Sequence, residues 1–298
     1  MYDVVIIGAG PAGLSAGIYA CRGGLKVAII ENKSVGGQAQ TAADIQNYPG
    51  IKSTSGFDLC YAMMNQCMEF GAEFVFDSIA SVSLIGEMKA IALANGKTVE
   101  TKNVIIASGA NARKLGVPNE SKFIGKGVSY CATCDGAFFK GKTVAVIGGG
   151  NTAAEDALYL EKLAKKVYMV HRRDALRADD ILVKRLEKSN VEIVWDSVVE
   201  NLGGEDKITQ LTLKNVKTNT LTTISVDGVF VAIGQTPNSQ GFENISLSSG
   251  GYIIADENMH TNIDGVYAAG DVREKSLRQV VTACADGAIA ANAIVNGI

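Results

Sequence analysis

The stretch DVVIIGAGPAG at residues 3–13 is a short apolar strand that runs directly into a glycine-rich turn. The pattern that follows predicts a helix from Leu14 to Arg22 and a second strand from Lys26 to Ile30. In such a turn the first glycine allows the sharp bend, the second lets the backbone approach a pyrophosphate, and the third lets the helix pack closely on the strand. The phosphates then lie at a helix N-terminus. The stretch therefore predicts a βαβ unit that binds a dinucleotide.

The same plan recurs 140 residues later, in the stretch TVAVIGGGNTA at residues 143–153. A helical pattern from Ala154 to Leu163 and a strand from Lys166 to Val170 follow at matching offsets. One glycine pattern is weak evidence, because many tight strand-to-helix turns use glycine for structural reasons alone. Two in register predict an α/β chain with two Rossmann-like nucleotide-binding domains of three-layer ββα architecture.

The order of the remaining elements predicts how the two domains are connected. Each copy continues with an amphipathic helix, a strand, a meander of short strands and a final apolar strand, which ends at Gly109 or Gly234. The tail beyond Gly234 has no counterpart in the second copy and includes an apolar helix from about residue 278 to 296. We expect this tail to pack on the first domain. The second domain, residues 114–243, is then an insertion into a first domain made of residues 1–113 and 244–298.

Composition excludes several classes of protein. The 298 residues have a formal net charge of −3 and 47% apolar content, which is ample for two buried cores. Acidic and basic residues are spread along the chain, so we expect no nucleic-acid partner. The longest apolar stretches are far shorter than the roughly 20 residues of a spanning helix, and a strand at the very N-terminus leaves no room for a signal peptide. We therefore expect no membrane partner and a cytoplasmic location.

Cys131 and Cys134 form a CxxC pair followed by Asp135, shortly before the second glycine turn. Two thiols at this spacing can close into a disulfide, and a nucleotide-linked carrier could open it again, which points to a disulfide reductase. A zinc site would need two more ligands, whereas the chain has two histidines and no second CxxC, so we expect no metal. Two unrelated structural thiols remain an alternative. The other cysteines lie in helix-like apolar patterns, and we expect them to be small buried hydrophobic residues: Cys21, Cys60, Cys67 and Cys284.

The residue after the second strand of each copy distinguishes the two nucleotides. Glu31 ends the first copy, where an acidic side chain can accept hydrogen bonds from ribose hydroxyls. His171 stands at the equivalent position of the second copy and is followed by three arginines: Arg172, Arg173 and Arg177. Arginines there can hold a 2′-phosphate, so the cluster favours NADP over NAD. The alternative is a solvated basic patch before the predicted helix at residues 179–188.

The chain as a whole resembles the low-molecular-weight, bacterial-type thioredoxin reductases, NADPH-dependent flavoproteins of the pyridine nucleotide-disulfide oxidoreductase class. The resemblance covers the full length, and CATCDG at residues 131–136 is its most specific motif. The other matching segments are Gly8–Gly13, Gly36-Gly37-Gln38, Asn47-Tyr48-Pro49-Gly50, Gly148–Ala153, His171–Arg177 and Gly270-Asp271.

The resemblance implies two sets of cofactor contacts. Those to FAD are Gly8, Gly10, Gly13, Glu31, Gly36, Gly37, Gln38, Asn47, Gly270, Asp271, Arg278, Gln279 and Val280. Those to NADPH are Gly148, Gly150, Asn151, Thr152, Ala153, His171, Arg172, Arg173 and Arg177. From sequence alone, Asn47 and Asp271 could equally be turn formers, because Asn and Asp next to glycine are ordinary turn residues.

The resemblance also implies a mechanism, in which electrons pass from NADPH through FAD to the Cys131–Cys134 disulfide and on to thioredoxin. Cys134 would meet the flavin, Cys131 would attack thioredoxin, and Asp135 would act as general acid and base. Because the dithiol and the NADPH site share one domain, that domain would rotate to present each in turn. A homodimer is implied as well. Three alternatives remain. Ferredoxin-fed reductases lack the nucleotide signatures of the second domain, and dithiol oxidases have little need for the arginine cluster. A redox-sensing binding module would keep the nucleotide sites only for structure.

Overall fold

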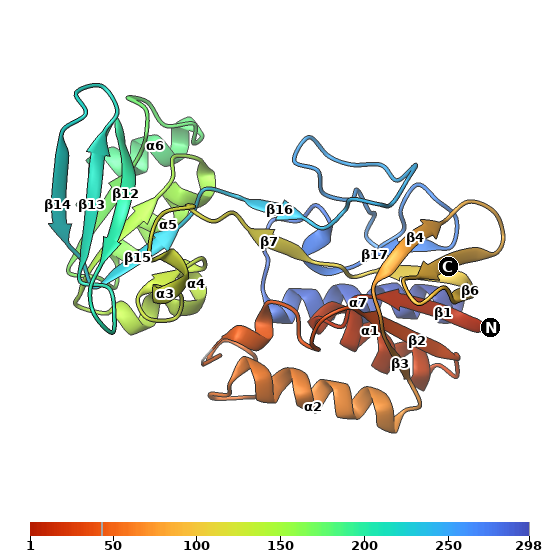
Figure 1. Cartoon of the computed structure of the whole chain (residues 1–298). Coiled ribbons are helices and arrows are strands. Elements are labelled where there is room, and N and C mark those ends of the chain that lie inside the picture. The colour runs from red at the N-terminus through yellow and green to blue at the C-terminus, as the bar shows by residue number, and fades with distance from the viewer. Residues whose placement is uncertain (43, 298) are drawn as a thin grey trace. The chain divides into compact units, whose positions relative to one another are not determined.

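The computed structural model describes residues 1–42 and 44–297 and divides into two compact units. The first consists of Met1–Asn111 and Thr236–Ile298, and the second of Ala112–Gln235 (Figure 1). Residues 236–243, expected in the second domain, belong to the first unit. The reason is local: Asn238 Nδ2 donates to the carbonyl of Ser108 at 2.8 Å, and Ser108 Oγ donates to the carbonyl of Asn238 at 2.7 Å.

The first unit is built on one seven-stranded sheet. Its strands are β1 (Tyr2–Ile7), β2 (Val27–Glu31), β3 (Glu73–Phe76), β4 (Ile79–Ser83), β5 (Lys89–Leu93), β6 (Thr98–Ile106) and β17 (Val266–Ala268). The end of β6 pairs in parallel with β1 and β17, while its beginning pairs antiparallel with β5. Strand β6 thus joins a parallel sheet to an antiparallel meander, as the sequence predicts.

Helices cover one face of this sheet and the meander covers the other. The helices are α1 (Pro11–Arg22), α2 (Gly56–Glu69) and α7 (Val280–Asn296), with short turns η1 (Ala39–Thr41) and η3 (Gly270–Val272). Alternate residues of β1 enter different cores, with Val4 and Ile6 on the helix side and Val5 and Ile7 on the other. Successive strand residues point to opposite faces, so a strand covered on both sides is apolar throughout. This is the predicted three-layer ββα arrangement.

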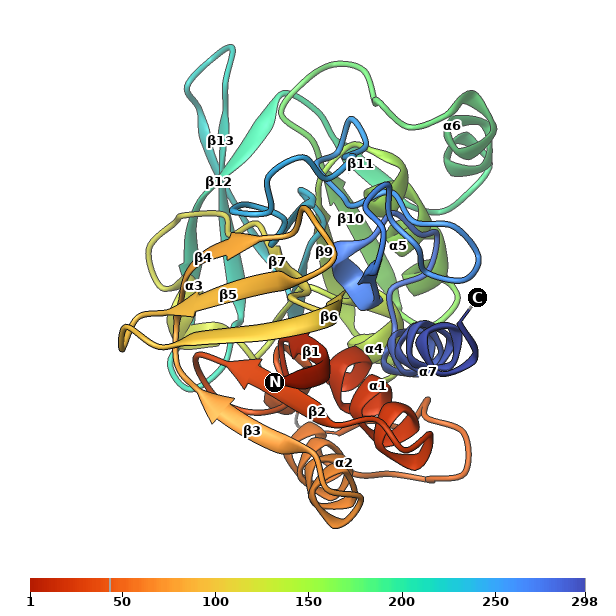
Figure 2. The same ribbon diagram turned by 90° about the vertical axis from the view of Figure 1, so that its right-hand side faces the viewer.

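Helices α1 and α7 lie side by side (Figure 2). Their close approach depends on Gly287, because a Cβ atom added there would overlap the carbonyl oxygen of Ala12. The C-terminal tail therefore packs on the first glycine turn. Neither these helices nor any other in the described residues is long and apolar enough to cross a membrane.

The second unit repeats the plan with its own five-stranded parallel sheet, in the order β11-β10-β9-β15-β8. Its strands are β8 (Val128–Ser129), β9 (Thr143–Ile147), β10 (Lys166–Val170), β11 (Glu192–Val194) and β15 (Gly228–Val231), and a separate meander contains β12 (Ser197–Gly203), β13 (Gln210–Asn215) and β14 (Leu221–Ser225). Its helices are α3 (Glu120–Phe123), α4 (Ala132–Asp135), η2 (Gly136–Phe139), α5 (Asn151–Glu161) and α6 (Asp180–Glu187).

Two short strands carry the chain between the units. They are β7 (Ala110–Ala112) and β16 (Gln235–Pro237), which pair in a two-stranded sheet. Hydrogen bonds from Asn238 N to Gly109 O and from Arg113 N to Gly234 O, at 2.9 and 3.0 Å, flank the pairing and make it antiparallel.

Candidate active site and cofactor sites

Cys131 and Cys134 are joined by a disulfide at the start of α4. Cys131 is the N-cap residue, and its Sγ accepts a hydrogen bond from the backbone N–H of Cys134 at 3.2 Å. Between them, Ala132 is buried in the core of the second unit and fixes the short helix in place. Cys131 is half-buried and Cys134 is exposed. The sulfur of Cys131 thus lies where a backbone donor would stabilise a thiolate.

Asp135 is held by a residue that sequence reasoning missed. Ser129, only 5% exposed, donates from Oγ to Oδ2 of Asp135 at 2.6 Å. The same Oγ accepts the backbone N–H of Cys131 at 3.1 Å. Ser129 therefore connects the carboxylate to the backbone of the dithiol. Its place two residues before Cys131 is the only signal in the sequence.

A second missed residue, Glu120, connects the dithiol segment to the residues that follow β7. Its buried carboxylate accepts the backbone N–H groups of Leu115 at 2.7 Å and Gly116 at 2.9 Å, and the hydroxyl of Tyr130 at 2.6 Å. Burial and this hydrogen bond raise the pKa of Tyr130. Three donors offset the cost of burying the charge. The segment next to Cys131 is thus tied to Leu115 and Gly116.

The first glycine turn has the shape of a pyrophosphate cradle. A Cβ atom on Gly13 would overlap the carbonyl of Gly8, and one on Gly8 would collide with the backbone of Ala107. At Gly10, by contrast, nothing lies within 4 Å of the Cβ position. The fold itself requires the outer glycines, while the middle one leaves open space at the N-terminus of α1.

Glu31 supports this turn with its carboxylate. Oε2 accepts the N–H of Ala9 at 2.9 Å, and Oε1 accepts those of Asn32 and Lys33, both at 2.9 Å. A carboxylate has about four lone-pair directions, so capacity for a ribose hydroxyl remains. Gly36 N donates to Ala9 O at 2.7 Å, which folds the loop containing Gly36, Gly37 and Gln38 back onto the turn.

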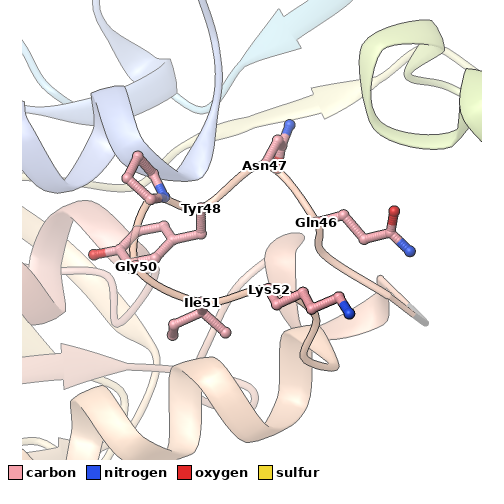
Figure 3. A pocket seen from close by; sticks show the side chains of 7 residues that line it. Gln46, Asn47, Tyr48, Gly50, Ile51 and Lys52 are labelled. Atoms are coloured by element: carbon pink, nitrogen blue, oxygen red, sulfur yellow. The ribbon is translucent and has the colours of Figure 1, made fainter.

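Two more expected FAD residues lie together, although their sequence positions are far apart. Asn47 Nδ2 donates to Oε1 of Gln279 at 2.9 Å, and Gln279 is the N-cap of α7 in a capping box with Thr282. Asn47 belongs to the loop 46–52, which lines a small open pocket (Figure 3). The side chains of Gln46, Asn47 and Lys52 point away from the loop. Asn47 therefore links this loop to the start of α7.

The Gly270-Asp271 motif is anchored by Asp286, which the sequence reasoning did not identify. Oδ2 of Asp286 accepts from the N–H of Gly270 at 3.0 Å, from Arg273 Nε at 3.1 Å and from Lys275 Nζ at 2.7 Å. A Cβ atom on Gly270 would press on Ala12, so the motif lies against the start of α1. The anchor brings the tail to the glycine turn.

Two polar atoms in this region are buried without a hydrogen-bond partner among the described residues, namely Asp271 Oδ1 and Arg278 Nε. Burial raises the pKa of Asp271. The Arg278 guanidinium stacks on the ring of Tyr252 at 4.1 Å from the centroid. Buried orphan groups are rare in folded proteins. A polar ligand such as the ribitol and pyrophosphate of FAD would satisfy them, so these residues fit the cofactor.

The second glycine turn, Gly148 to Ala153, repeats the cradle. A Cβ atom on Gly148 would overlap the carbonyl of Ala232, whereas the Cβ position of Gly150 is open. Gly149 has another role, because a Cβ there would overlap the imidazole ring of His171. The first copy has Ala9 at the position of Gly149 and Glu31 at that of His171. In both copies a residue at the end of the second strand thus contacts the turn: Glu31 is the last residue of β2, and His171 directly follows β10.

The arginine cluster surrounds His171. Burial, and then the positive charges of Arg177, Arg173 and Arg172, lower the pKa of His171. All three arginines are exposed, and within residues 1–42 and 44–297 none forms an ion pair with a carboxylate. Arg177 N donates to Gly149 O at 2.7 Å, which ties the cluster to the glycine turn. Uncompensated positive charge beside a phosphate cradle fits a 2′-phosphate better than a solvated patch.

Residues at the start of α5 complete this site. Asn151 and Asp179 exchange two hydrogen bonds of 2.8 Å, which join the start of α5 to the N-cap of α6, and Thr152 is exposed beside them. The remaining cysteines are free thiols on helices: Cys21, Cys60, Cys67 and Cys284. In the described part of the chain, no three His, Cys, Asp or Glu side chains lie close enough together to hold a metal ion.

Comparison with known proteins gives consistent matches over the full length. A family model described as pyridine nucleotide-disulphide oxidoreductase matches residues 2–287. A thioredoxin reductase of Peptoclostridium acidaminophilum is 47% identical over 98% of this chain and 95% of its own. The crystal structure of thioredoxin reductase from Streptococcus pyogenes aligns with a TM-score of 0.94 at 44% identity, covering 99% of this chain and 97% of that chain. Lactococcus lactis thioredoxin reductase in the FR conformation gives 0.68 at 40% identity, with 100% of both chains covered.

Proposed function

The chain belongs to the pyridine nucleotide-disulphide oxidoreductase family, and we propose on this basis that it is an NADPH-dependent, FAD-containing thioredoxin reductase. Electrons pass from NADPH through FAD to the Cys131–Cys134 disulfide and on to thioredoxin. The observation that carries the proposal is the disulfide at the start of α4, on the same unit as a glycine turn with uncompensated arginines. A two-electron acceptor and a dinucleotide site are thereby brought into one chain.

The two glycine turns divide the cofactors between the units. The first unit would hold FAD through the open side of Gly10, Glu31, Asn47 and the anchored Asp271. The second would hold NADPH through Gly150 and the arginine cluster. When bound, FAD supplies the step between hydride chemistry at a nicotinamide and thiol chemistry at the dithiol.

The protein residues then carry out thiol–disulfide exchange. In the reduced enzyme, the Cys131 thiolate attacks one sulfur of the thioredoxin disulfide, which breaks that bond and forms a mixed disulfide. The Cys134 thiolate next attacks Cys131, reforms the Cys131–Cys134 bond and releases the second thiolate of thioredoxin. The enzyme dithiol loses two electrons and thioredoxin gains them. The hydrogen bond from Cys134 N to Cys131 Sγ supports Cys131 as the attacking thiolate.

Asp135 is the group proposed to move protons in this exchange. It takes the proton of the Cys134 thiol when that sulfur becomes a nucleophile and gives one to a departing thiolate of thioredoxin. A half-buried carboxylate adjacent in sequence to Cys134 suits both transfers.

We infer that the two units change their arrangement during turnover, because the dithiol and the NADPH site share one unit and both must reach the same FAD. Solved relatives support this: two structures of 44% and 40% identity give whole-chain TM-scores of 0.94 and 0.68. Such a difference at similar identity is expected when the same two units occur in more than one arrangement. We further propose a homodimer, and a reducing compartment such as the cytoplasm, where the four remaining cysteines stay as thiols.

The first prediction tests both the activity and its nucleotide. The purified flavoprotein should reduce a bacterial thioredoxin with NADPH far faster than with NADH, measured by nucleotide absorbance. Replacing Arg172 and Arg173 with alanine should raise KM for NADPH by more than about 100-fold, since two charge-assisted phosphate contacts are lost and each costs roughly 1.5–3 kcal/mol. The NADH rate should change little. Absence of thioredoxin reduction by the wild type would refute the function, and an unchanged NADPH preference would refute the arginine assignment alone.

A further inference from the structure

Ser129 lies at the end of β8 and contacts both parts of the proposed thiol chemistry. Its Oγ is 2.6 Å from Oδ2 of Asp135 and 3.1 Å from the backbone N of Cys131. Ser129 is only 5% exposed. Its hydroxyl bonds both the proposed general acid, Asp135, and the backbone of the proposed nucleophile, Cys131, so it can affect the reaction as well as the packing.

The direction of the hydrogen bonds follows from counting protons. A serine hydroxyl has one proton and two lone pairs. It receives the N–H of Cys131, so its own proton goes to an acceptor, either Asp135 Oδ2 at 2.6 Å or Cys131 O at 3.3 Å. The shorter contact to a carboxylate is the stronger one. Ser129 therefore donates to Asp135.

This arrangement separates the two oxygens of the carboxylate. Oδ2 is occupied by Ser129, whereas Oδ1 has no protein partner in the part of the chain that the structure describes. The N–H of Asp135 also donates to Cys131 O at 3.1 Å, so backbone and side chain both fix the residue against the dithiol segment.

We propose that Ser129 is a positioning residue for the proposed reductase reaction: it holds Oδ2 of Asp135 and leaves Oδ1 to exchange protons with the cysteine sulfurs. This rests on the proposed function. The need arises because α4 has only four residues and the disulfide that closes its first turn opens in every cycle. Once the disulfide is open, the Ser129 contacts still tie Asp135 to Cys131. Alanine at position 129 would free the carboxylate to turn toward water.

The test is Ser129→Ala, with Ser129→Thr as the variant that retains the hydroxyl. The enzyme is reduced in advance, and its oxidation by thioredoxin disulfide is followed in a single turnover. We expect the maximal rate of Ser129→Ala to fall about tenfold, a fraction of the roughly 100- to 10,000-fold that general acid–base groups contribute. The thioredoxin concentration giving half the maximal rate should not change, and Ser129→Thr should recover most of the rate.

Two controls separate positioning from a loss of structure. Ser197→Ala removes another buried serine hydroxyl of the second unit, which donates to the carbonyl of Trp195, and should leave the exchange rate unchanged. In an Asp135→Asn background, Ser129→Ala should cost little more, because residues that act through one another are not additive. Equal costs in both backgrounds, or no recovery with threonine, would overturn the proposal.

The same variants, assayed with lipoamide as a small disulfide substrate, distinguish a failure of the proposed function from a failure of the positioning role of Ser129. If the wild type fails to reduce thioredoxin, the proposed function fails. A Ser129-dependent loss that persists with lipoamide would still support the positioning role, and its absence with both disulfides would reject it.

Discussion

Asp156 shows how one residue can couple folding to pH. It lies on α5, adjacent to the buried Ala157 and one turn before the buried Leu160. Burial, and then the neighbouring charge of Glu155, raise the pKa of Asp156 to about 7. The folded unit therefore binds a proton more tightly than the unfolded chain, where an Asp titrates near about 3.9.

The sign of the pH dependence follows from linkage. The protonated carboxyl stabilises the folded state, so its contribution is complete below about pH 4 and is lost as the pH rises to about 7. We expect Asp156→Asn, which does not titrate, to gain about 4 kcal/mol over the wild type between pH 4 and pH 8, because the two pKa values differ by about three units and each unit is worth about 1.4 kcal/mol. Urea unfolding at the two pH values measures this. Glu155→Gln, an exposed neighbour, should show a much smaller effect, and a pH-independent difference between Asp156→Asn and wild type would contradict the prediction.

At this scale, the sequence identifies residues whose chemistry is unusual and misses those that support them. The Cys131–Cys134 pair and the glycines stand out by spacing. Ser129, Glu120 and Asp286 do not, because a buried polar residue is recognisable only once its donors are placed around it by distant segments. Gly149 is part of the glycine pattern in the sequence, but the sequence does not show why this position requires glycine. The ring of His171, more than twenty residues away, occupies the space that a side chain would need.

At the scale of elements, the second glycine turn permits a comparison between adjacent positions. Gly149→Ala would push a methyl group into the His171 ring, while Gly150→Ala would place one in open space at an ordinary φ of −102°. We expect Gly149→Ala to lower stability by about 1–3 kcal/mol through overpacking. Gly150→Ala should leave the melting temperature unchanged and weaken NADPH binding, because its methyl occupies the space for the pyrophosphate.

Thermal unfolding and NADPH titration of both variants measure these effects. Replacing His171 with alanine should restore stability to Gly149→Ala but should not restore NADPH binding to Gly150→Ala. Equal loss of stability in the two glycine variants would mean that the His171 contact does not determine the choice of glycine.

Both βαβ units could be predicted because strand, turn and helix alternate within a short span, and each has a local signature. Strands β9 and β10 have the bounds expected. The helices begin earlier, at Pro11 and Asn151, since the last positions of each turn already take helical conformation. The two- and three-residue strands β8 and β17 carry no periodicity, so only pairing with distant strands defines them.

At the scale of the whole molecule, the proposed rearrangement of the two units predicts how a covalent constraint acts. A non-reducible cross-link between the units should preserve one half-reaction, either reduction by NADPH or exchange with thioredoxin, and lower complete turnover by more than about tenfold. Rapid-mixing spectroscopy measures the half-reactions separately. The same reagent attached to one unit only serves as control. Normal turnover in a fully cross-linked sample would be incompatible with the rearrangement.

The insertion could be inferred from the unmatched tail, but the point of return could not. In the sequence, Pro237 fits a connecting segment better than the interior of an element, whereas Asn238 is bonded to Ser108 and Asn111 within the first unit. The sequence around Asn238 does not predict these contacts, because its partners lie well over a hundred residues earlier.

The antiparallel pairing of β7 with β16 has a consequence for modularity. Hydrogen bonds on either side set Asn111 opposite Thr236, the two residues at which the first unit is interrupted. Strands paired in this way lie about 4.8 Å apart and can be closed by a hairpin loop of about two residues. We therefore expect that residues 112–235 can be excised and replaced with a tight turn, which would leave the first unit with a continuous chain.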